Sequence, residues 1–277
     1  TAVITAAKND VKASCIVTVV PKSGGDVTPP PGGDITPPPG GDITPPGSNL
    51  TEEQKKQVET LTKKLGVSEE TAIKIQAVGE QYDVPEQTLL ISDKTITGQK
   101  SEADIKGSTF AVLQARVSKT TNTQITLKWT KVKGADGYLI YGNKCGKSNK
   151  YKLIKTIKKN STTTFTQKKL KKGTFYKYIV RAYKEVDGHK ITLAASKTIH
   201  FVTNGGKSGN EKSVNVNKTK VNLKKGKSFT IKAKAVKGSK KIVSHRKISY
   251  ESGNPKVAKV TAKGKVTALA KGTCTIY

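Results

Sequence analysis

Apolar and polar residues follow two different periods along this chain. In residues 51–82 the apolar positions recur every three or four residues, which is the pattern of amphipathic helices. Beyond residue 110 they alternate with polar residues in short runs separated by Gly, Asn and Lys, which is typical of strands and turns. The pattern predicts a mainly β protein with one small α-helical module.

The helical module carries its own start and stop signals. Thr51 and Gln54 are spaced as a capping box, and Gly66 is expected to end the first helix. Ser68 is the expected cap of a second helix, whose acidic first turn suits the positive end of the helix dipole. A short third helix or turn is expected over residues 86–90.

One stretch of this module, "LGVSEETAIKI" at residues 65–75, resembles the turn and second helix of a helix-turn-helix. Such a helix places its N-terminal residues beside DNA phosphates. Here those residues are Glu69 and Glu70, and phosphate contact is what drives this kind of binding. We expect a helical hairpin that does not read DNA.

The first fifty residues combine an alternating segment with a repeated phrase. Residues 1–6 and 13–20 alternate and predict a two-stranded hairpin, which is not stable by itself. Residues 24–47 then repeat Gly-Gly-Asp, Val or Ile, Thr, and two or three prolines three times. Proline lacks a backbone donor, and one aliphatic residue per copy is too little to bury. The phrase predicts a Pro/Gly linker over 21–48, with separate bodies on either side.

Residues 110–203 resemble a fibronectin type III domain through three groups of residues. Trp129 in "LKW" corresponds to the strand-B tryptophan of the family, and Tyr138 and Tyr141 in "GADGYLIYG" lie in the counterpart of strand C. The stretch "LKKGTFYKYIVRAY" corresponds to the corner and strand F. The resemblance implies a β-sandwich with the tyrosine-corner hydroxyl on Tyr176. The Arg-Gly-Asp loop of some members is absent, so integrin-type adhesion is not implied.

Residues 213–277 resemble a bacterial Ig-like domain of group 2, the repeat type of bacterial surface proteins and invasins. The stretches "VNLKKGKSFTIKA", "ISYESGNPKVAKV" and "GKVTALAKGTCTI" carry the resemblance. Family members continue with two closing strands, and residues 1–20 resemble those strands, with Thr1–Ile4 matching Thr273–Ile276. We interpret both ends as cuts through such a domain. A further hypothesis is that residues 1–20 complete the C-terminal domain by strand addition.

The expected fold class is therefore tandem Ig-like and fibronectin-type β-sandwiches with a small helical module and a linker. The predicted division is 1–20, C-terminal strands of a truncated bacterial Ig-like domain; 21–48, Gly/Pro-rich linker; 49–92, helical module; 93–109, connector; 110–203, fibronectin type III-like domain; 204–212, linker; 213–277, bacterial Ig-like domain truncated at its C-terminus. The chain contains no methionine, which favours a fragment or mature segment.

No catalytic, cofactor-binding or metal-binding residue is predicted, so the chain is not expected to be an enzyme. The cysteines, Cys15, Cys145 and Cys274, lack metal-ligand spacing and are interpreted as incidental thiols. The histidines, His189, His200 and His245, have no local partner and are interpreted as surface or edge residues. Beyond residue 107 the only acidic residues are Asp136, Glu185, Asp187, Glu211 and Glu251, which disfavours a glycosidase acid pair.

The net charge of +31 is concentrated in one part of the chain. Residues 107–277 hold 40 basic and 5 acidic residues, and all but three of the 51 basic residues in the chain are lysine. Lysine is a hydrated point charge, whereas arginine offers the planar fork used to recognise phosphates and bases. We therefore expect diffuse attraction to anionic cell-wall or extracellular polymers and no specific nucleic acid. No apolar run is long enough to predict a membrane span.

The predicted function is that of a non-catalytic structural and adhesive segment of a bacterial cell-surface or secreted protein, located outside the cell. Two alternatives remain open. The helical module is a candidate for specific binding of a host protein or glycan, such as immunoglobulin or matrix protein. Alternatively, these are accessory modules of an extracellular carbohydrate-active enzyme.

Overall fold

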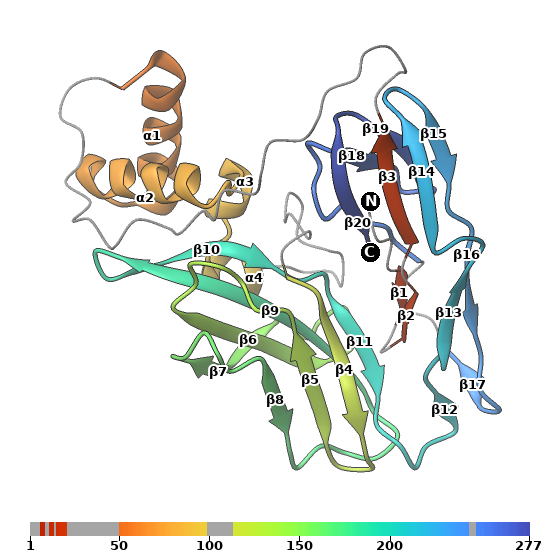
Figure 1. Cartoon of the computed structure of the whole chain (residues 1–277). Helices are drawn as coiled ribbons and strands as arrows, with labels where there is room; N and C mark the ends of the chain where they lie inside the picture. Colours follow the sequence, from red (N-terminus) through yellow and green to blue (C-terminus); the bar gives the residue numbers. More distant parts are fainter. Residues whose placement is uncertain (1–5, 9–10, 14, 21–49, 99–112, 244–247) are drawn as a thin grey trace.

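The computed structural model describes residues 6–8, 11–13, 15–20, 50–98, 113–243 and 248–277 (Figure 1). A helical module, a two-sheet sandwich and a C-terminal group of small sheets follow one another. The chain is mostly β, as the alternating pattern predicted. Among the described residues, no helix is long and apolar enough to cross a membrane.

The first two helices begin and end where the sequence predicted. Helix α1 (Glu52–Leu65) starts at Thr51, whose hydroxyl accepts from the Gln54 amide at 3.3 Å while the Gln54 side chain accepts from the Thr51 amide at 2.9 Å. It ends at Gly66, which has a φ of 69°. Helix α2 (Glu69–Gln81) starts at Ser68, whose hydroxyl accepts from the Thr71 amide at 3.2 Å. Both capping predictions are confirmed.

Two short helices complete the module. Helix α3 (Glu86–Leu89) occupies the range where a third helix or turn was expected. Helix α4 (Asp93–Thr97) falls at the start of the range predicted as a connector, so the helical part extends further than the sequence indicated. A second capping box, between Ser92 and Thr95, starts this helix. The remainder of that range, from residue 99, lies outside the described residues.

The sandwich pairs a three-stranded sheet with a five-stranded one. The first has the order β4-β5-β8, and the second has the order β10-β9-β6-β7 with β11 also pairing β9. Their bounds are β4 Ala115–Thr120, β5 Ile125–Trp129, β6 Gly137–Lys144, β7 Lys152–Ile157, β8 Thr164–Gln167, β9 Phe175–Val186, β10 His189–Ala195 and β11 Ile199–Val202. Trp129 and Tyr138 meet between the sheets, edge to face, with ring centroids 5.3 Å apart.

The tyrosine corner lies where the family resemblance placed it. The Tyr176 hydroxyl accepts a hydrogen bond from the Lys171 amide at 3.0 Å. This bond ties the start of β9 to the loop that precedes it, as the corner does in Ig-type sandwiches. The assignment of Tyr176 is confirmed.

The C-terminal region consists of short strands in several small sheets. Two pairs are β12 (Ser208–Gly209) with β17 (Lys241–Ile242), and β13 (Ser213–Val216) with β16 (Ala233–Val236). A three-stranded sheet has the order β15 (Ser228–Thr230), β19 (Lys265–Ala268), β18 (Ala258–Val260). Another contains β14 (Lys220–Lys224) and β20 (Gly272–Ile276).

The central strand of that last sheet comes from the other end of the chain. Strand β3 (Cys15–Val20) lies between β14, to which it is parallel, and β20, to which it is antiparallel (Figure 1). This confirms the hypothesis of strand addition. The predicted hairpin was wrong in one respect: β1 (Ala6–Lys8) pairs with β2 (Val11–Ala13), whereas β3 pairs with the distant strands. Residues 1–5 lie outside the described residues.

Candidate functional site

The helical module covers one face of the five-stranded sheet. Ile91 and Ile96 are buried there against a cluster of sheet residues, namely Leu139, Tyr141, Tyr151, Ile179, Tyr183 and Ala195. Each face of β6 and β9 is therefore buried, one against the other sheet and one against the helical module. This explains why the residues of β6 from Gly137 to Gly142 are all buried.

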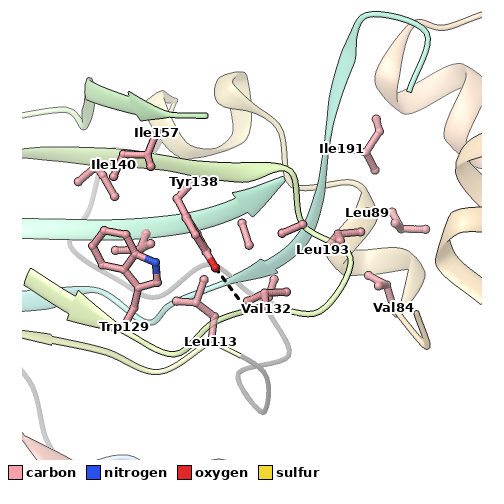
Figure 2. Packing of buried hydrophobic residues seen from close by; sticks show 14 of the residues in the cluster. Val84, Leu89, Leu113, Trp129, Val132, Tyr138, Ile140, Ile157, Ile191 and Leu193 are labelled. Atoms are coloured by element: carbon pink, nitrogen blue, oxygen red, sulfur yellow. Dashed lines mark hydrogen bonds between the residues drawn. The ribbon is translucent and has the colours of Figure 1, made fainter. Parts of the chain in front are cut away.

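A second apolar contact joins the module to the core of the sandwich. The main buried cluster runs from Leu61 and Ile75 of the helices, through Leu89, to Trp129 and Tyr138 between the sheets. Figure 2 shows Val84 and Leu89 facing Ile191 and Leu193 of β10 within this cluster. The module and the sandwich therefore share a hydrophobic core rather than packing as two independent bodies.

A buried arginine connects the two parts through polar contacts. The Arg181 side chain is 3% exposed, and its Nη1 donates to Asp93 Oδ1 at 2.6 Å. Its Nε donates to the Thr192 hydroxyl at 2.5 Å, and that hydroxyl in turn donates to the Ile91 carbonyl. The hydroxyl of Tyr141 also donates to the Asp93 carboxylate.

This network attaches Asp93, the first residue of α4, and Ile91, two residues before it, to β9 and β10. Because Arg181 is buried, its charge requires the Asp93 partner, and removing a partner from a buried charge is costly. Burial is also the main cause that raises the pKa of Tyr141, so this phenol stays protonated as a donor across the physiological range. The contacts specify one orientation of the module.

The N-terminal turn of α2 is held by the hairpin that joins β9 to β10. The Thr71 hydroxyl donates to Asp187 Oδ2 at 3.0 Å, and Lys74 Nζ lies 3.1 Å from the same oxygen. Asp187 has a φ of 46° and Gly188 a φ of 77°, the backbone of a tight hairpin turn. The hydrogen bond from Lys74 is the largest cause that lowers the pKa of Asp187.

The C-terminal region also contacts both other parts. The carboxylate of Glu251 is 7% exposed and accepts from the Gln114 side chain at 2.8 Å, while Lys197 Nζ lies 3.1 Å away. On the surface, Lys256 Nζ lies 3.0 Å from Asp83 Oδ1 of the helical module. A buried carboxylate with two partners in the sandwich is the stronger of these links, since exposed pairs contribute little.

The acidic residues of the basic half mostly lie beside lysines. The pairs are Asp136–Lys184 at 3.5 Å, Glu185–Lys190 at 3.6 Å, Asp187–Lys74 at 3.1 Å and Glu251–Lys197 at 3.1 Å. Glu211 is buried. Within the part of the chain that the structure describes, no group of three His, Cys, Asp or Glu residues is placed to hold a metal ion.

The histidine interpretation is partly wrong. His189 is exposed at the start of β10, but His200 is buried in β11. At the end of β11 the Asn210 side chain accepts from the Val202 amide at 3.0 Å and donates to the Val202 carbonyl at 2.8 Å. His245 lies outside the described residues. Of the cysteines, Cys145 is half-buried and Cys274 is buried.

Exposed lysines gather along one edge of the five-stranded sheet. Strand β7 is the edge strand, and the segment 144–159 around it contains no acidic residue. Its seven lysines are all exposed, namely Lys144, Lys147, Lys150, Lys152, Lys155, Lys158 and Lys159. We call this segment the β7 edge. Lysines on an edge strand oppose sheet-to-sheet aggregation, and they also present a strong positive field.

Comparison with known protein families identifies two domains. Residues 110–192 match the fibronectin type III domain, and residues 211–277 match the bacterial Ig-like domain (group 2). The chain therefore contains one domain of each kind, as the sequence resemblances indicated. No curated protein matches. A solved structure titled "Myokine structure" is 18% identical over 35% of this chain and 99% of its own, with a TM-score of 0.29, too low to support any inference.

Proposed function

We propose that this chain is a non-catalytic segment of a bacterial cell-surface or secreted protein that spaces modules and displays them outside the cell. Domains of the two matched kinds fit an extracellular structural or adhesive module. The repeated Gly/Pro phrase over 24–47 supports the spacing role, because such a sequence is extended and lacks a core. The carboxylates that the structure places beside lysines support a structural use of these residues.

One observation carries the display role: the helical module shares a core with the sandwich and is oriented by the Arg181–Asp93 pair. A module held this way presents one fixed surface, which lowers the entropy cost of contact with a partner. The same contacts place the first turn of α2 against Asp187. This supports the expectation that α2 does not enter a DNA groove, because that turn would have to face the phosphates.

The partners that we propose are anionic polymers outside the cell, such as wall polymers, and the β7 edge is the surface that we propose for them. Its lysines are exposed and unopposed by acids within the segment. Binding of this kind is electrostatic, weakens with salt and needs no specific geometry. A host protein or glycan bound by the exposed face of the helical module remains the alternative.

The location is tested by brief protease treatment of intact source cells. Peptides of this chain are expected in the supernatant of unlysed cells, with the spacer over 21–48 cut before the sandwich because it has no predicted core. Peptides released only after lysis would refute an extracellular role.

The polymer surface is tested by co-sedimentation with purified wall teichoic acid at low salt. The variant Lys152→Gln/Lys155→Gln/Lys158→Gln/Lys159→Gln is expected to bind at least about tenfold more weakly. A surface with fewer lysines neutralises fewer anionic groups and therefore releases fewer counterions on binding. The matched control changes four exposed lysines of the C-terminal region, Lys224, Lys225, Lys227 and Lys232, to Gln. An equal loss in both variants would show that net charge, and not the β7 edge, is responsible.

A further inference from the structure

The C-terminal Ig-like domain contains a site for a β-strand, which is filled by β3. Residues Ile16 to Val20 pair in parallel with Lys220 to Lys224, and Cys15 to Val19 pair antiparallel with Ile276 to Gly272. The sheet order is β14-β3-β20, so β14 and β20 each form ladder hydrogen bonds with β3 and are not neighbours of each other in this sheet. A central strand of this kind carries ladder hydrogen bonds on both of its edges.

The strands on either side of β3 also contribute side chains to the apolar core of the domain. Leu223 of β14 and Cys274 and Ile276 of β20 are buried in the core cluster of this domain. Recognition of the inserted strand rests on main-chain hydrogen bonds and on alternate side-chain positions. These features are identical for a strand from the same molecule and for one from a second copy.

Only the tether distinguishes the two sources. Strand β3 connects to α1 through residues 21–51, which include the repeated Gly/Pro phrase. A linker of this length holds β3 near its own site at an effective concentration on the order of millimolar or below. Proline stiffens the linker, which lowers this concentration further when the length of the linker does not match the distance between its ends. A second copy at a comparable concentration therefore competes with the molecule's own strand.

We propose that the site between β14 and β20 also accepts residues 15–20 of a second copy, so that copies of this chain exchange their N-terminal strands. Exchange of an identical element is a route to assembly that requires no new interface. Two copies that exchange reciprocally form a closed dimer, and copies that exchange in series form a longer chain. On a surface where copies are concentrated, the exchange links neighbouring molecules.

The register provides a direct test, because Val17 is the ladder partner of Cys274. Paired Cα atoms in an antiparallel ladder are about 4.5–5.5 Å apart, which a disulfide spans. Two full-length variants are prepared, both with Cys15→Ser and Cys145→Ser. The donor adds Val17→Cys and Cys274→Ser, whereas the acceptor keeps Val17 and Cys274. A disulfide between donor and acceptor can form only when the donor strand occupies the acceptor's site.

Donor and acceptor are unfolded together, refolded at protein concentrations from about 10 µM to about 1 mM and oxidised. We expect a covalent donor–acceptor dimer whose fraction rises roughly in proportion to concentration while it stays below the effective concentration of the tethered strand. A reference chain with Val17→Cys and native Cys274 is expected to form an internal disulfide. The matched control donor carries Ile16→Cys, whose ladder partner is Thr275, and is expected to give little dimer.

Absence of the dimer at every concentration, or a yield equal to that of the Ile16→Cys control, overturns strand exchange between copies. Failure of the reference chain to join Cys274 to the introduced cysteine at position 17, either within one copy or between copies, also overturns it, because β3 would then not occupy the site at all. Light scattering of the unmodified chain after refolding at the same concentrations checks the result without cysteine substitutions: exchange predicts dimers or larger species, and a uniform monomer contradicts it.

Discussion

The helical module and the C-terminal Ig-like domain are both too small to bury a large core, and they obtain burial in different ways. The module adds its residues to the core of the neighbouring sandwich, which contains Trp129, Tyr138 and Tyr178. The Ig-like domain keeps its own cluster of eight buried residues, none of them aromatic, with Phe229 and Tyr250 only partly buried. It takes a central strand from more than 200 residues away in the sequence. One unit therefore depends on its neighbour, and the other on a distant segment.

Loss of residues 1–20 is the change with the largest expected effect on this comparison. Without β3, both β14 and β20 lose a ladder partner, and a core of this size supplies at most about 3–5 kcal/mol of stability. We expect the Ig-like domain to be largely unfolded at room temperature, while the helical module and sandwich keep their stability. Hydrogen–deuterium exchange at β14, β20 and β6 measures both parts in one sample.

The double variant Val17→Pro/Val19→Pro tests the same dependence without shortening the chain, because proline removes donors from a central strand. Thr28→Pro, within the predicted spacer, is the matched control and should leave exchange unchanged. Unaltered protection at β14 and β20 in the deletion variant would mean that β3 contributes nothing to the domain.

Local signals in the sequence were sufficient for many features of this fold. Capping residues predicted the starts of α1 and α2, and the tyrosine corner was assigned from its surrounding stretch. These features depend on residues within a few positions of one another, which a sequence displays directly. Strand addition could also be predicted, because residues 213–277 lack the two closing strands of the family pattern and residues 1–20 resemble those strands.

The docking of the helical module was not predicted, although a signal existed. The stretch "GYLIYG" is apolar on both faces, which indicates a strand covered on each side. The sequence does not show what covers the second face, because Ile91 and Ile96 lie roughly 40 residues or more before that strand. The burial of His200 was not predicted either, because the alternation of its strand does not show whether that strand is covered.

The shared core of the module and sandwich is tested by Leu89→Ala. Leu89 is fully buried between α2 and β10, and its Cδ1 lies close to Gly79. Truncating a buried leucine costs about 2–5 kcal/mol, and here we expect the loss to lower the unfolding midpoints of the helices and the sandwich together. Denaturant unfolding followed by far-ultraviolet circular dichroism and by Trp129 fluorescence reports the two parts separately.

Leu153→Ala is the matched control, because Leu153 is 45% exposed on β7 and its truncation should change stability by less than about 0.5 kcal/mol. If Leu89→Ala shifts only the helical signal and leaves the fluorescence midpoint in place, the module is an independent body and the contrast with the Ig-like domain disappears.

The smallest expected effect concerns the contact of α2 with Asp187. The hydrogen bond from Lys74 holds the pKa of Asp187 below its ordinary value, so this contact stabilises docking above the unfolded pKa of aspartate, about 4, and is lost as pH falls through the folded pKa. The pKa of Lys74 is raised, first by Glu70 and then by Asp187, so the lysine stays charged throughout that window. We therefore expect Asp187→Asn to reduce amide protection at Thr71 and Ala72 a few-fold at neutral pH.

The difference between Asp187→Asn and the unmodified chain should shrink as pH falls below the ordinary range of aspartate, and also in about 1 M salt, because the groups are exposed and screened. Glu185→Gln is the matched control: its carboxylate pairs with Lys190 on the same hairpin at 3.6 Å, and no contact with α2 involves it. It should leave protection of α2 unchanged at every pH. Equal protection in Asp187→Asn and the unmodified chain at neutral pH would show that the apolar core and the Arg181 network orient the module without help from Asp187.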